Sequence, residues 1–141
     1  MENSSVGDFM KRSSHWLPLE CSLEEVVRYS QKTNQSFFPA MKSGKVKGLF
    51  NLSGHSFESI SGEGLRLPHR SEVLFLNPLL VSPRAPLMDV FKEMVNGSES
   101  IAVVTERQKP VGLLFWNKEL ASQLDESLMA PYSQTGDLSR F

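Results

Sequence analysis

The sequence repeats itself at a spacing of 64 positions, and this duplication limits the possible folds more than any other feature. Residues 16–51 align without a gap on residues 80–115, so that apolar and turn positions keep step throughout. The same order of elements is predicted in each copy. The matched pairs include Leu17 with Val81, Leu23 with Leu87, Glu25 with Asp89, Val26 with Val90 and Gly48 with Gly112. The chain is therefore expected to contain one small unit twice.

The first copy is predicted to form a strand, a helix and two further strands. Residues 15–19 are a short apolar run, and Ser22 with Glu25 has the form of a capping box at the start of a helix. Residues 37–41 and 46–51 then read as two strands joined by a short turn. These elements account for most of the first copy.

The second copy repeats this plan with a stronger helical pattern. Its strands are predicted at 79–81, 101–105 and 111–116, and its first helix is expected to end in a left-handed exit at Asn96-Gly97. Asn117 is expected to cap a final helix. Apolar residues at helical spacing predict the buried faces: Leu87, Val90, Phe91, Met94 and Val95 in the first helix, and Leu120, Ala121, Leu124 and Leu128 in the last.

These patterns divide the chain into four parts. Residues 1–64 are predicted to form the first repeat with its lead-in, 65–78 a connecting segment, 79–130 the second repeat and 131–141 a loose tail. The connecting segment contains four successive apolar residues, Val73–Leu76, which a flexible linker does not need. We expect these four residues to be packed.

Composition and charge exclude several classes of protein. The 141 residues include 15 Lys+Arg and 16 Asp+Glu, so the chain lacks the basic excess of a duplex-binding protein. The single cysteine, Cys21, cannot form an intramolecular disulfide or a cysteine-rich zinc site. No apolar run is long enough to cross a membrane, and no signal-peptide pattern opens the sequence. We therefore expect a cytoplasmic protein that binds neither nucleic acid nor membrane.

The sequence also lacks the signatures of an enzyme. It has no glycine-rich phosphate loop and no Gly-x-Ser-x-Gly elbow. His15, His55 and His69 fall at unrelated spacings, so neither a catalytic residue nor a metal site is predicted. Cys21 lies just before the start of a predicted helix, and a helix N-terminus lowers the pKa of a nearby thiol. Two interpretations of Cys21 therefore stay open: a reactive thiol, or a plain small residue.

Together the two copies resemble a tandem pair of cystathionine β-synthase (CBS) domains, the arrangement called a Bateman module, over roughly residues 6–128. The family's third strand typically opens with an apolar residue, a glycine and two more apolar residues. The segments that carry the likeness are Phe9-Met10, Leu23-x-x-Val26 and Leu87-x-x-Val90, Phe38-Pro39-Ala40-Met41 and Ala102-Val103-Val104-Thr105, and most specifically Lys45-Val-Lys-Gly-Leu-Phe50 and Lys109-Pro-Val-Gly-Leu-Leu114.

The resemblance implies an α/β (α+β) fold of two βαββα repeats related by pseudo-twofold symmetry, with their small sheets packed together. It also implies two clefts between the repeats, in which family members often bind AMP, ATP or S-adenosylmethionine. Such modules commonly form homodimers. Their ligands regulate an attached or partner protein by shifting the population of two arrangements.

The positions at which the family reads its nucleotide are altered in this chain. Nucleotide-binding members place Thr or Ser directly after the Gly-apolar-apolar stretch and Asp three residues later. The corresponding positions hold Asn51 and Gly54 in the first repeat, and Phe115 and Lys118 in the second. Gly54 has no side chain, and a lysine cannot accept hydrogen bonds from ribose hydroxyls, although it can meet a phosphate.

Two interpretations of the cleft remain open. In one, side chains such as Phe115 and Trp116 fill the cleft, and the protein is a ligand-free dimerisation or interaction scaffold. In the other, an aromatic side chain stacks a flat ring whose polar end is bound by a polar residue, and the protein is a non-catalytic sensor of a small-molecule effector. The candidate ligand-binding residues are His15, Leu17, Phe37, Asn51, Gly54, His55, Leu80, Ile101, Phe115 and Lys118.

Overall fold

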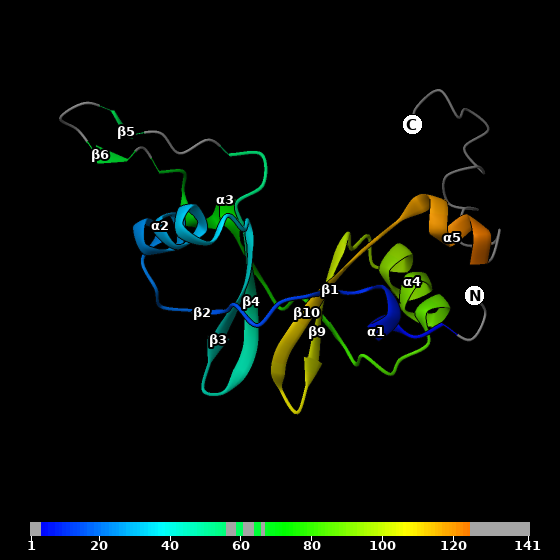
Figure 1. Ribbon diagram of the computed structural model, residues 1–141. Helices are drawn as coiled ribbons and strands as arrows, with labels where there is room; N and C mark the ends of the chain where they lie inside the picture. Colours follow the sequence, from blue (N-terminus) through cyan, green and yellow to red (C-terminus); the bar gives the residue numbers. More distant parts are fainter. Residues whose placement is uncertain (1–3, 56–58, 61–63, 66, 125–141) are drawn as a thin grey trace, which may run out of the picture. The chain divides into compact units, whose positions relative to one another are not determined.

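The computed structural model describes residues 4–55, 59–60, 64–65 and 67–124, which form two compact units (Figure 1). The first-repeat unit contains the described residues of 14–78 together with Arg107–Pro110. The second-repeat unit contains Leu79–Glu106, the described residues from Val111 onward, and residues 4–13. The predicted tail and Leu128 lie outside the described residues.

A four-stranded sheet in the order β2-β3-β4-β7 forms the centre of the first-repeat unit. Strand β2 (Leu17–Pro18) runs parallel to β3 (Phe37–Lys42). Strands β4 (Lys45–Asn51) and β7 (Leu74–Leu76) extend the sheet with antiparallel pairing. The unit also contains α2 (Leu23–Thr33), α3 (Arg70–Val73) and a two-stranded ribbon of β5 (Ser59–Ile60) and β6 (Gly64–Leu65).

The core of the first-repeat unit joins α2 and α3 to one face of this sheet. Phe38 and Ala40 are two residues apart on β3, so both side chains point to the same face of the sheet. Val26 and Val27 of α2 are fully buried in the same cluster. The remaining buried members are Cys21, Phe50, Leu52 and Val73.

The second-repeat unit has a sheet of the same kind, in the order β8-β9-β10-β1. Strand β8 (Leu79–Val81) runs parallel to β9 (Ile101–Glu106), and β1 (Lys11–Arg12) pairs antiparallel with β10 (Lys109–Phe115). Helices α1 (Val6–Phe9), α4 (Leu87–Asn96) and α5 (Lys118–Leu124) complete the unit.

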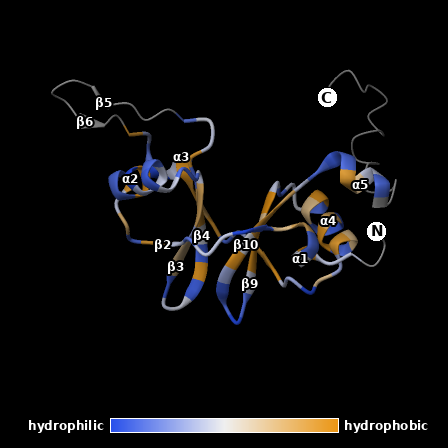
Figure 2. Cartoon of the chain, viewed as in Figure 1, coloured by the Kyte–Doolittle hydropathy of each residue, from blue (hydrophilic) through white to orange (hydrophobic). Residues whose placement is uncertain are grey.

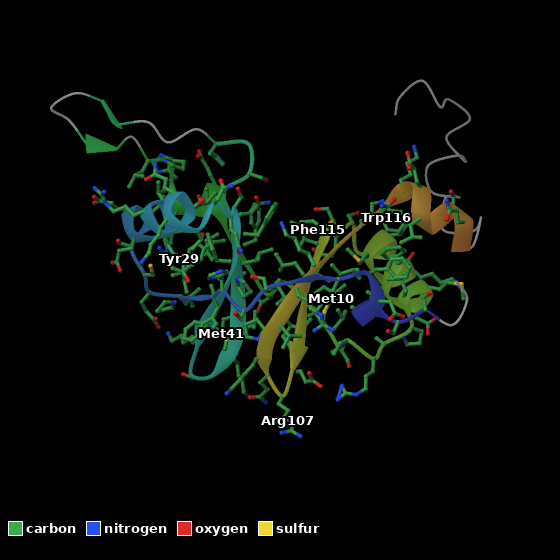
Figure 3. All side chains as sticks on the ribbon, viewed as in Figure 1. Met10, Tyr29, Met41, Arg107, Phe115 and Trp116 are labelled. Carbon is green, nitrogen blue, oxygen red and sulfur yellow. The ribbon has the colours of Figure 1, made fainter. Side chains whose placement is uncertain are left out.

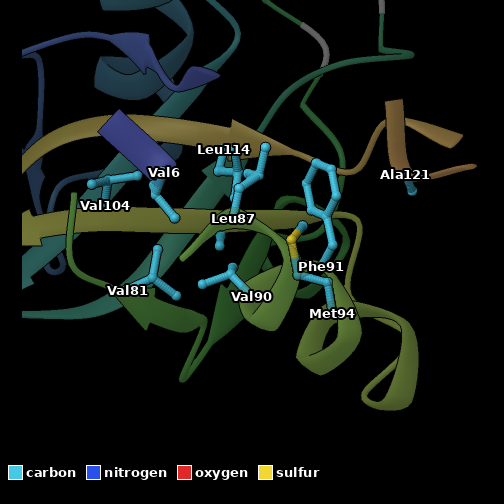
Figure 4. Close-up of a cluster of buried hydrophobic side chains, with 10 residues drawn as sticks. Val6, Val81, Leu87, Val90, Phe91, Met94, Val104, Leu114 and Ala121 are labelled. Atoms are coloured by element: carbon cyan, nitrogen blue, oxygen red, sulfur yellow. The ribbon is translucent and has the colours of Figure 1, made fainter. Parts of the chain in front are cut away.

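The core of the second-repeat unit follows the predicted helical stripe. Leu87, Val90, Phe91 and Met94 of α4 are all buried and meet Val104, Leu114 and Ala121 (Figure 4). Hydrophobic residues follow the strands, whereas the β9–β10 turn and much of the α5 surface are hydrophilic (Figure 2). The periodicity of α4 in the sequence is therefore explained by this core.

The predicted duplication is confirmed by the bounds of the elements. Helices α1 and α3, strands β3 and β9, and strands β4 and β10 each begin and end 64 residues apart. Main-chain hydrogen bonds repeat in the same way. The N–H of Leu52 donates to the oxygen of Ser36 at 2.8 Å, and the N–H of Trp116 donates to that of Ser100 at 2.9 Å.

The edge helix and edge strand of each unit come from the segment that precedes the other repeat in the sequence. Residues 4–13 supply α1 and β1 to the second-repeat unit, and residues 70–76 supply α3 and β7 to the first-repeat unit. The sequence boundaries 1–64 and 79–130 assign the lead-in to the first repeat instead. The difference arises because strand pairing, not chain order, decides which sheet a segment joins.

Two predicted helix termini agree with the structure, and one does not. Ser22 accepts a hydrogen bond from the Glu25 N–H at 3.1 Å, and its hydroxyl donates to the Glu25 carboxylate at 2.9 Å. The amide oxygen of Asn117 accepts from the Leu120 N–H at 2.9 Å. The left-handed residue after α4 is Ser98, with φ 55°, because Gly97 has φ −92° and still belongs to the last turn.

The apolar connecting segment is only partly packed, contrary to expectation. Val73 is fully buried and Leu74 packs against the core. Phe75 and Leu76, however, expose 50% and 62% of their surface. These two residues lie on the edge strand β7, whose pairing with β4 still orders the backbone.

Candidate functional site

The first-repeat candidates gather at one end of their sheet. Phe37, the first residue of β3, is the direct cross-strand partner of Asn51, the last residue of β4. Because β2 runs parallel to β3, His15 enters the sheet at this same end. Gly54 and His55 follow in the turn after β4, where the His55 N–H donates to the Leu52 oxygen at 3.2 Å. Leu17 lies further along β2, opposite Ala40, and packs against the core.

Asn51 and Gly54 differ in what they can offer a ligand. The Asn51 side-chain oxygen accepts from the Ser53 N–H at 2.9 Å and from the Ser53 hydroxyl at 2.6 Å. Its two amide N–H groups are then the part that can donate to a ligand. Gly54 has φ +83°, and a Cβ built on it would meet no atom of the described residues within 4 Å. Among the residues that the structure describes, the first-repeat site therefore has an amide donor and adjacent open space, but no carboxylate at position 54.

His15 is held by an aromatic group of α2. The Nδ1 of His15 lies 2.8 Å from the hydroxyl of Tyr29, and the two rings meet edge to face. The ring of Tyr29, which Figure 3 labels on α2, packs in turn on Phe38 with 5.2 Å between the ring centroids. This arrangement fixes the entrance of β2 against the helix.

The second-repeat candidates occupy the corresponding end of the other sheet. Ile101 begins β9, Phe115 ends β10 and Lys118 is the first residue of α5. Leu80 on β8 is paired with Val103 and exposes 45% of its surface. The ammonium group of Lys118 places a donor where the first repeat has Gly54.

The two aromatic residues after the second Gly-apolar-apolar stretch have different surroundings. Trp116 packs edge to face on Phe91, with 5.1 Å between centroids, and belongs to the border of the core. Phe115 is half-buried at the end of β10 (Figure 3). Trp116 therefore serves packing, whereas Phe115 is the aromatic residue at the strand end.

The surroundings of Cys21 disfavour its thiolate form. Burial, reinforced by the nearby Glu25 carboxylate, raises the pKa of the thiol, and this outweighs the opposing effect of Arg70. The Cys21 Sγ lies 3.6 Å from the Ser22 carbonyl oxygen. Since the thiolate is the reactive form, the reading of Cys21 as a plain small residue is favoured.

The described part of the chain contains no cluster of three or more His, Cys, Asp and Glu residues that could hold a metal ion. Within the same ranges, no helix combines the length and the apolar content that crossing a membrane requires.

A cavity of about 490 Å³ lies near the β3–β4 hairpin, within the first-repeat unit. Its lining includes Trp16, Met41 and Pro110 as apolar residues and Lys42 and Lys109 as basic ones. None of the ten candidate residues lines it. This cavity is therefore separate from the strand-end positions.

Arg70 is a residue that the sequence patterns did not single out. Its guanidinium group donates to the carbonyl oxygens of Leu19 and Cys21, the latter at 2.8 Å, and lies over the Phe50 ring at 5.4 Å from the centroid. The position aligned with it, 64 residues earlier, is Val6 of the second-repeat unit. The contrast between a charged and an apolar residue at one repeat position was the signal available in the sequence.

Comparison with solved structures identifies the fold. The CBS domain pair of protein MJ0100, in complex with 5′-methylthioadenosine and S-adenosyl-L-methionine, matches with a TM-score of 0.58 at 17% identity, over 88% of this chain and 97% of that one. The CBS domain of a bacterial CNNM/CorC family Mg²⁺ transporter in complex with ATP has a TM-score of 0.60 at 16% identity, over 87% and 88%. CBSX2 in complex with AMP has a TM-score of 0.57 at 13% identity, over 88% and 97%.

Neither a family model nor a curated protein matches the sequence. The likeness is therefore one of fold, and it agrees with the repeated sheets and their strand orders. The chain has the fold of a tandem CBS-domain pair.

Proposed function

We propose that the protein is a non-catalytic regulatory module that binds a small effector carrying an adenosyl group. The observation that carries this proposal is the likeness of fold to CBS structures solved with S-adenosylmethionine and 5′-methylthioadenosine, with AMP and with ATP. Ligand binding would act by favouring one arrangement of the protein over another, to the extent that it binds the two with different affinity.

The first-repeat strand end is the site we assign to the effector. Asn51 offers amide donors, Phe37 lies beside it across the strand pair, and no described residue fills the space at Gly54. An amide donor suits a phosphate, carboxylate or ring-nitrogen acceptor. Because Gly54 cannot accept from the two ribose hydroxyls, we expect weaker adenosyl binding than a carboxylate at this position would give.

The second-repeat strand end is proposed to favour an anionic group. Lys118 supplies a cationic donor there, and Phe115 supplies an aromatic ring at the end of β10. A phosphate-bearing ligand such as ATP satisfies a lysine better than an uncharged nucleoside does. ATP is therefore expected to be bound more tightly than adenosine.

Calorimetry and thermal unfolding with AMP, ATP and S-adenosylmethionine test the proposal. A ligand present at about 100 times its Kd and bound only by the native state adds about 2.7 kcal/mol of stability. We expect at least one of the three to raise the melting temperature in a concentration-dependent way. If none does so at millimolar concentration, the effector is not an adenosyl compound.

Two substitutions sharpen this test at the first-repeat site. N51D keeps an acceptor for the Ser53 N–H and hydroxyl but removes the amide donors, so it is expected to weaken binding. G54D introduces the missing carboxylate and is expected to strengthen binding of ligands with a free ribose. G44D is the matched control, because Gly44 also has a positive φ, +76°, and open space around its Cβ position.

The alternative function, a scaffold that associates through an exposed apolar surface, has one observation in its favour. Phe75 and Leu76 are exposed on β7, which is an edge strand of its sheet. Exposed apolar residues on an edge strand invite pairing with another chain. Sedimentation velocity separates the two functions, since a scaffold of this kind is expected to dimerise without ligand and to lose the dimer on F75K/L76K.

A further inference from the structure

The two repeats hold the junction between their first strand and first long helix by different means. In the second repeat the carbonyl oxygens of Pro83 and Ala85 accept from main-chain N–H groups, those of Gly7 at 2.7 Å and Val6 at 2.9 Å. The aligned oxygens in the first repeat belong to Leu19 and Cys21. They accept from the two terminal nitrogens of a single side chain, Arg70.

Arg70 not only replaces the main-chain donors chemically but also stands at the sequence position of one of them. Arg70 aligns with Val6 and Ser71 aligns with Gly7, because each pair is 64 residues apart. The forked guanidinium therefore occupies the role of two successive main-chain N–H groups. A guanidinium can do this because its donors are rigidly spaced and aimed in parallel.

The residue that follows Val6 and Arg70 also differs between the two copies: it is Gly7 in one and Ser71 in the other. A Cβ built on Gly7 would lie 3.1 Å from the Pro83 oxygen and 3.5 Å from the Pro83 Cβ, so the close main-chain approach there depends on the missing side chain. Ser71 carries a Cβ at the aligned position. In the first repeat the long side chain of Arg70 makes the two hydrogen bonds instead.

Arg70 also contacts β4, which carries the candidate Asn51, and the segment that follows β2, which carries the candidate Leu17. The oxygens it binds follow β2, which contains Leu17, and its guanidinium lies 5.4 Å from the ring centroid of Phe50, the residue directly before Asn51. Arg70 is only partly exposed, and its cation–π contact adds to its hydrogen bonds. One side chain thus links the segment between β2 and α2 to Phe50, the residue before Asn51.

We propose that Arg70 is a positioning residue of the first-repeat ligand site, which holds the segments around Leu19–Cys21 and Phe50–Asn51 in register by replacing the main-chain bonds of the second repeat. The part about the ligand rests on the proposed function. The part about register concerns the protein alone. Loss of this side chain loosens the first repeat and leaves the second repeat unchanged, because the second repeat uses main-chain donors.

Amide hydrogen exchange without ligand tests the register. R70V is expected to speed exchange at Leu19, Leu52 and Ser53 by about tenfold, because these amides donate to Met41, Ser36 and Asn51 next to the contacts that are lost. Trp116, the counterpart of Leu52, is expected to keep its rate. R28A is the matched control, since Arg28 lies on the exposed face of α2 and pairs there with Glu24. Unchanged exchange in R70V overturns the proposal.

The double variant R70V/S71G tests the mechanism of positioning. It gives the first repeat the residues of the second, so the main chain can make the two bonds itself, and the exchange rates are expected to return toward those of the wild type. R70K, which has one point charge and no fork, is expected to restore them only in part. A double variant that exchanges as fast as R70V shows that main-chain donors do not replace Arg70, and contradicts the assignment.

Affinity for AMP, measured by calorimetry on the same variants, tests the link to the ligand. We expect R70V to weaken AMP binding about tenfold and R70V/S71G to recover it. If the double variant recovers the exchange rates but not the affinity, Arg70 contacts the ligand directly and is not a positioning residue. If AMP does not bind the wild type, AMP is not the effector of the proposed function. The exchange measurements still decide whether Arg70 holds the register of the first repeat.

Discussion

Gly48 and Gly112 have equivalent surroundings in the two sheets. Gly48 pairs with Leu76, and a Cβ built on it would meet a side-chain atom of Leu74 and the Phe75 oxygen. Gly112 pairs with Arg12, and its Cβ would meet a side-chain atom of Met10 and the Lys11 oxygen. Each contact residue of one glycine is 64 positions from its counterpart. The duplication therefore extends to single contacts at the sheet edge.

This equivalence predicts that replacing either glycine destabilises the protein, but by different amounts. In G112A the new methyl group would lie 2.8 Å from a main-chain oxygen, whereas in G48A the nearest atom, at 3.0 Å, is the end of the flexible Leu74 side chain. We expect G112A to lower the free energy of unfolding by about 1–3 kcal/mol and G48A by less. Urea denaturation of the two variants measures this, and a larger loss in G48A would contradict it.

Much of the fold could be predicted from the sequence because its elements are locally encoded. The capping box at Ser22 and Glu25, the cap at Asn117 and the stripe of α4 all appear where their patterns place them. Each pattern needs only residues within one or two turns of chain. The 64-residue spacing then linked local elements into two copies.

What could not be predicted depends on contacts between distant segments. No local pattern shows that residues 4–13 join the sheet of the second repeat, because a short edge strand such as Lys11–Arg12 carries almost no periodicity. The exposure of Phe75 and Leu76 likewise depends on what covers β7, not on its composition.

The sequence predicts the hairpin that carries two of the candidate residues, but not the chemistry around them. The strands were predicted at 37–41 and 46–51, and in the structure Phe37 and Asn51 are direct cross-strand partners at the ends of β3 and β4. The hydrogen bonds of Ser53 to Asn51 and of Arg70 to Leu19 and Cys21 involve side-chain directions that a pattern of residue types does not contain.

An exposed ion pair is conserved between the repeats with its charges exchanged. Arg84 donates to Glu106 through two nitrogens at 2.8 and 2.9 Å, and the aligned Glu20 and Lys42 lie 4.0 Å apart. Reversing one charge with E106K is expected to cost up to about 1 kcal/mol, and R84E/E106K is expected to recover most of it. A double-mutant cycle by urea denaturation measures the coupling. The coupling of Glu20 with Lys42 should be smaller, since their contact is single and longer.

The two tryptophans are expected to report different environments. Trp16 exposes 47% of its surface, whereas Trp116 packs on Phe91 at the border of the core. In single-tryptophan variants, acrylamide should quench Trp16 fluorescence in W116F several-fold more efficiently than Trp116 fluorescence in W16F. Equal quenching would show that Trp116 is not packed. W116A is also expected to destabilise the protein by about 2–3 kcal/mol.

The raised pKa of Cys21 predicts a loss of stability in alkaline solution. The folded protein holds the thiol proton more tightly than the unfolded chain does, because burial and the Glu25 carboxylate disfavour the thiolate. The associated stability is fully present below the unfolded pKa of about 8.5 and is lost as the pH rises through the higher folded value. The free energy of unfolding of the wild type should therefore fall relative to that of C21A above about pH 8.5. Urea denaturation of both proteins from pH 7 to about 10 measures the difference between their free energies of unfolding. Taking this difference cancels the contribution of the other groups that titrate in alkaline solution, because both proteins contain them. A constant difference across this range would show that the thiol titrates normally, and the Cys21 side chain would then have to be more exposed than its 9% accessibility indicates.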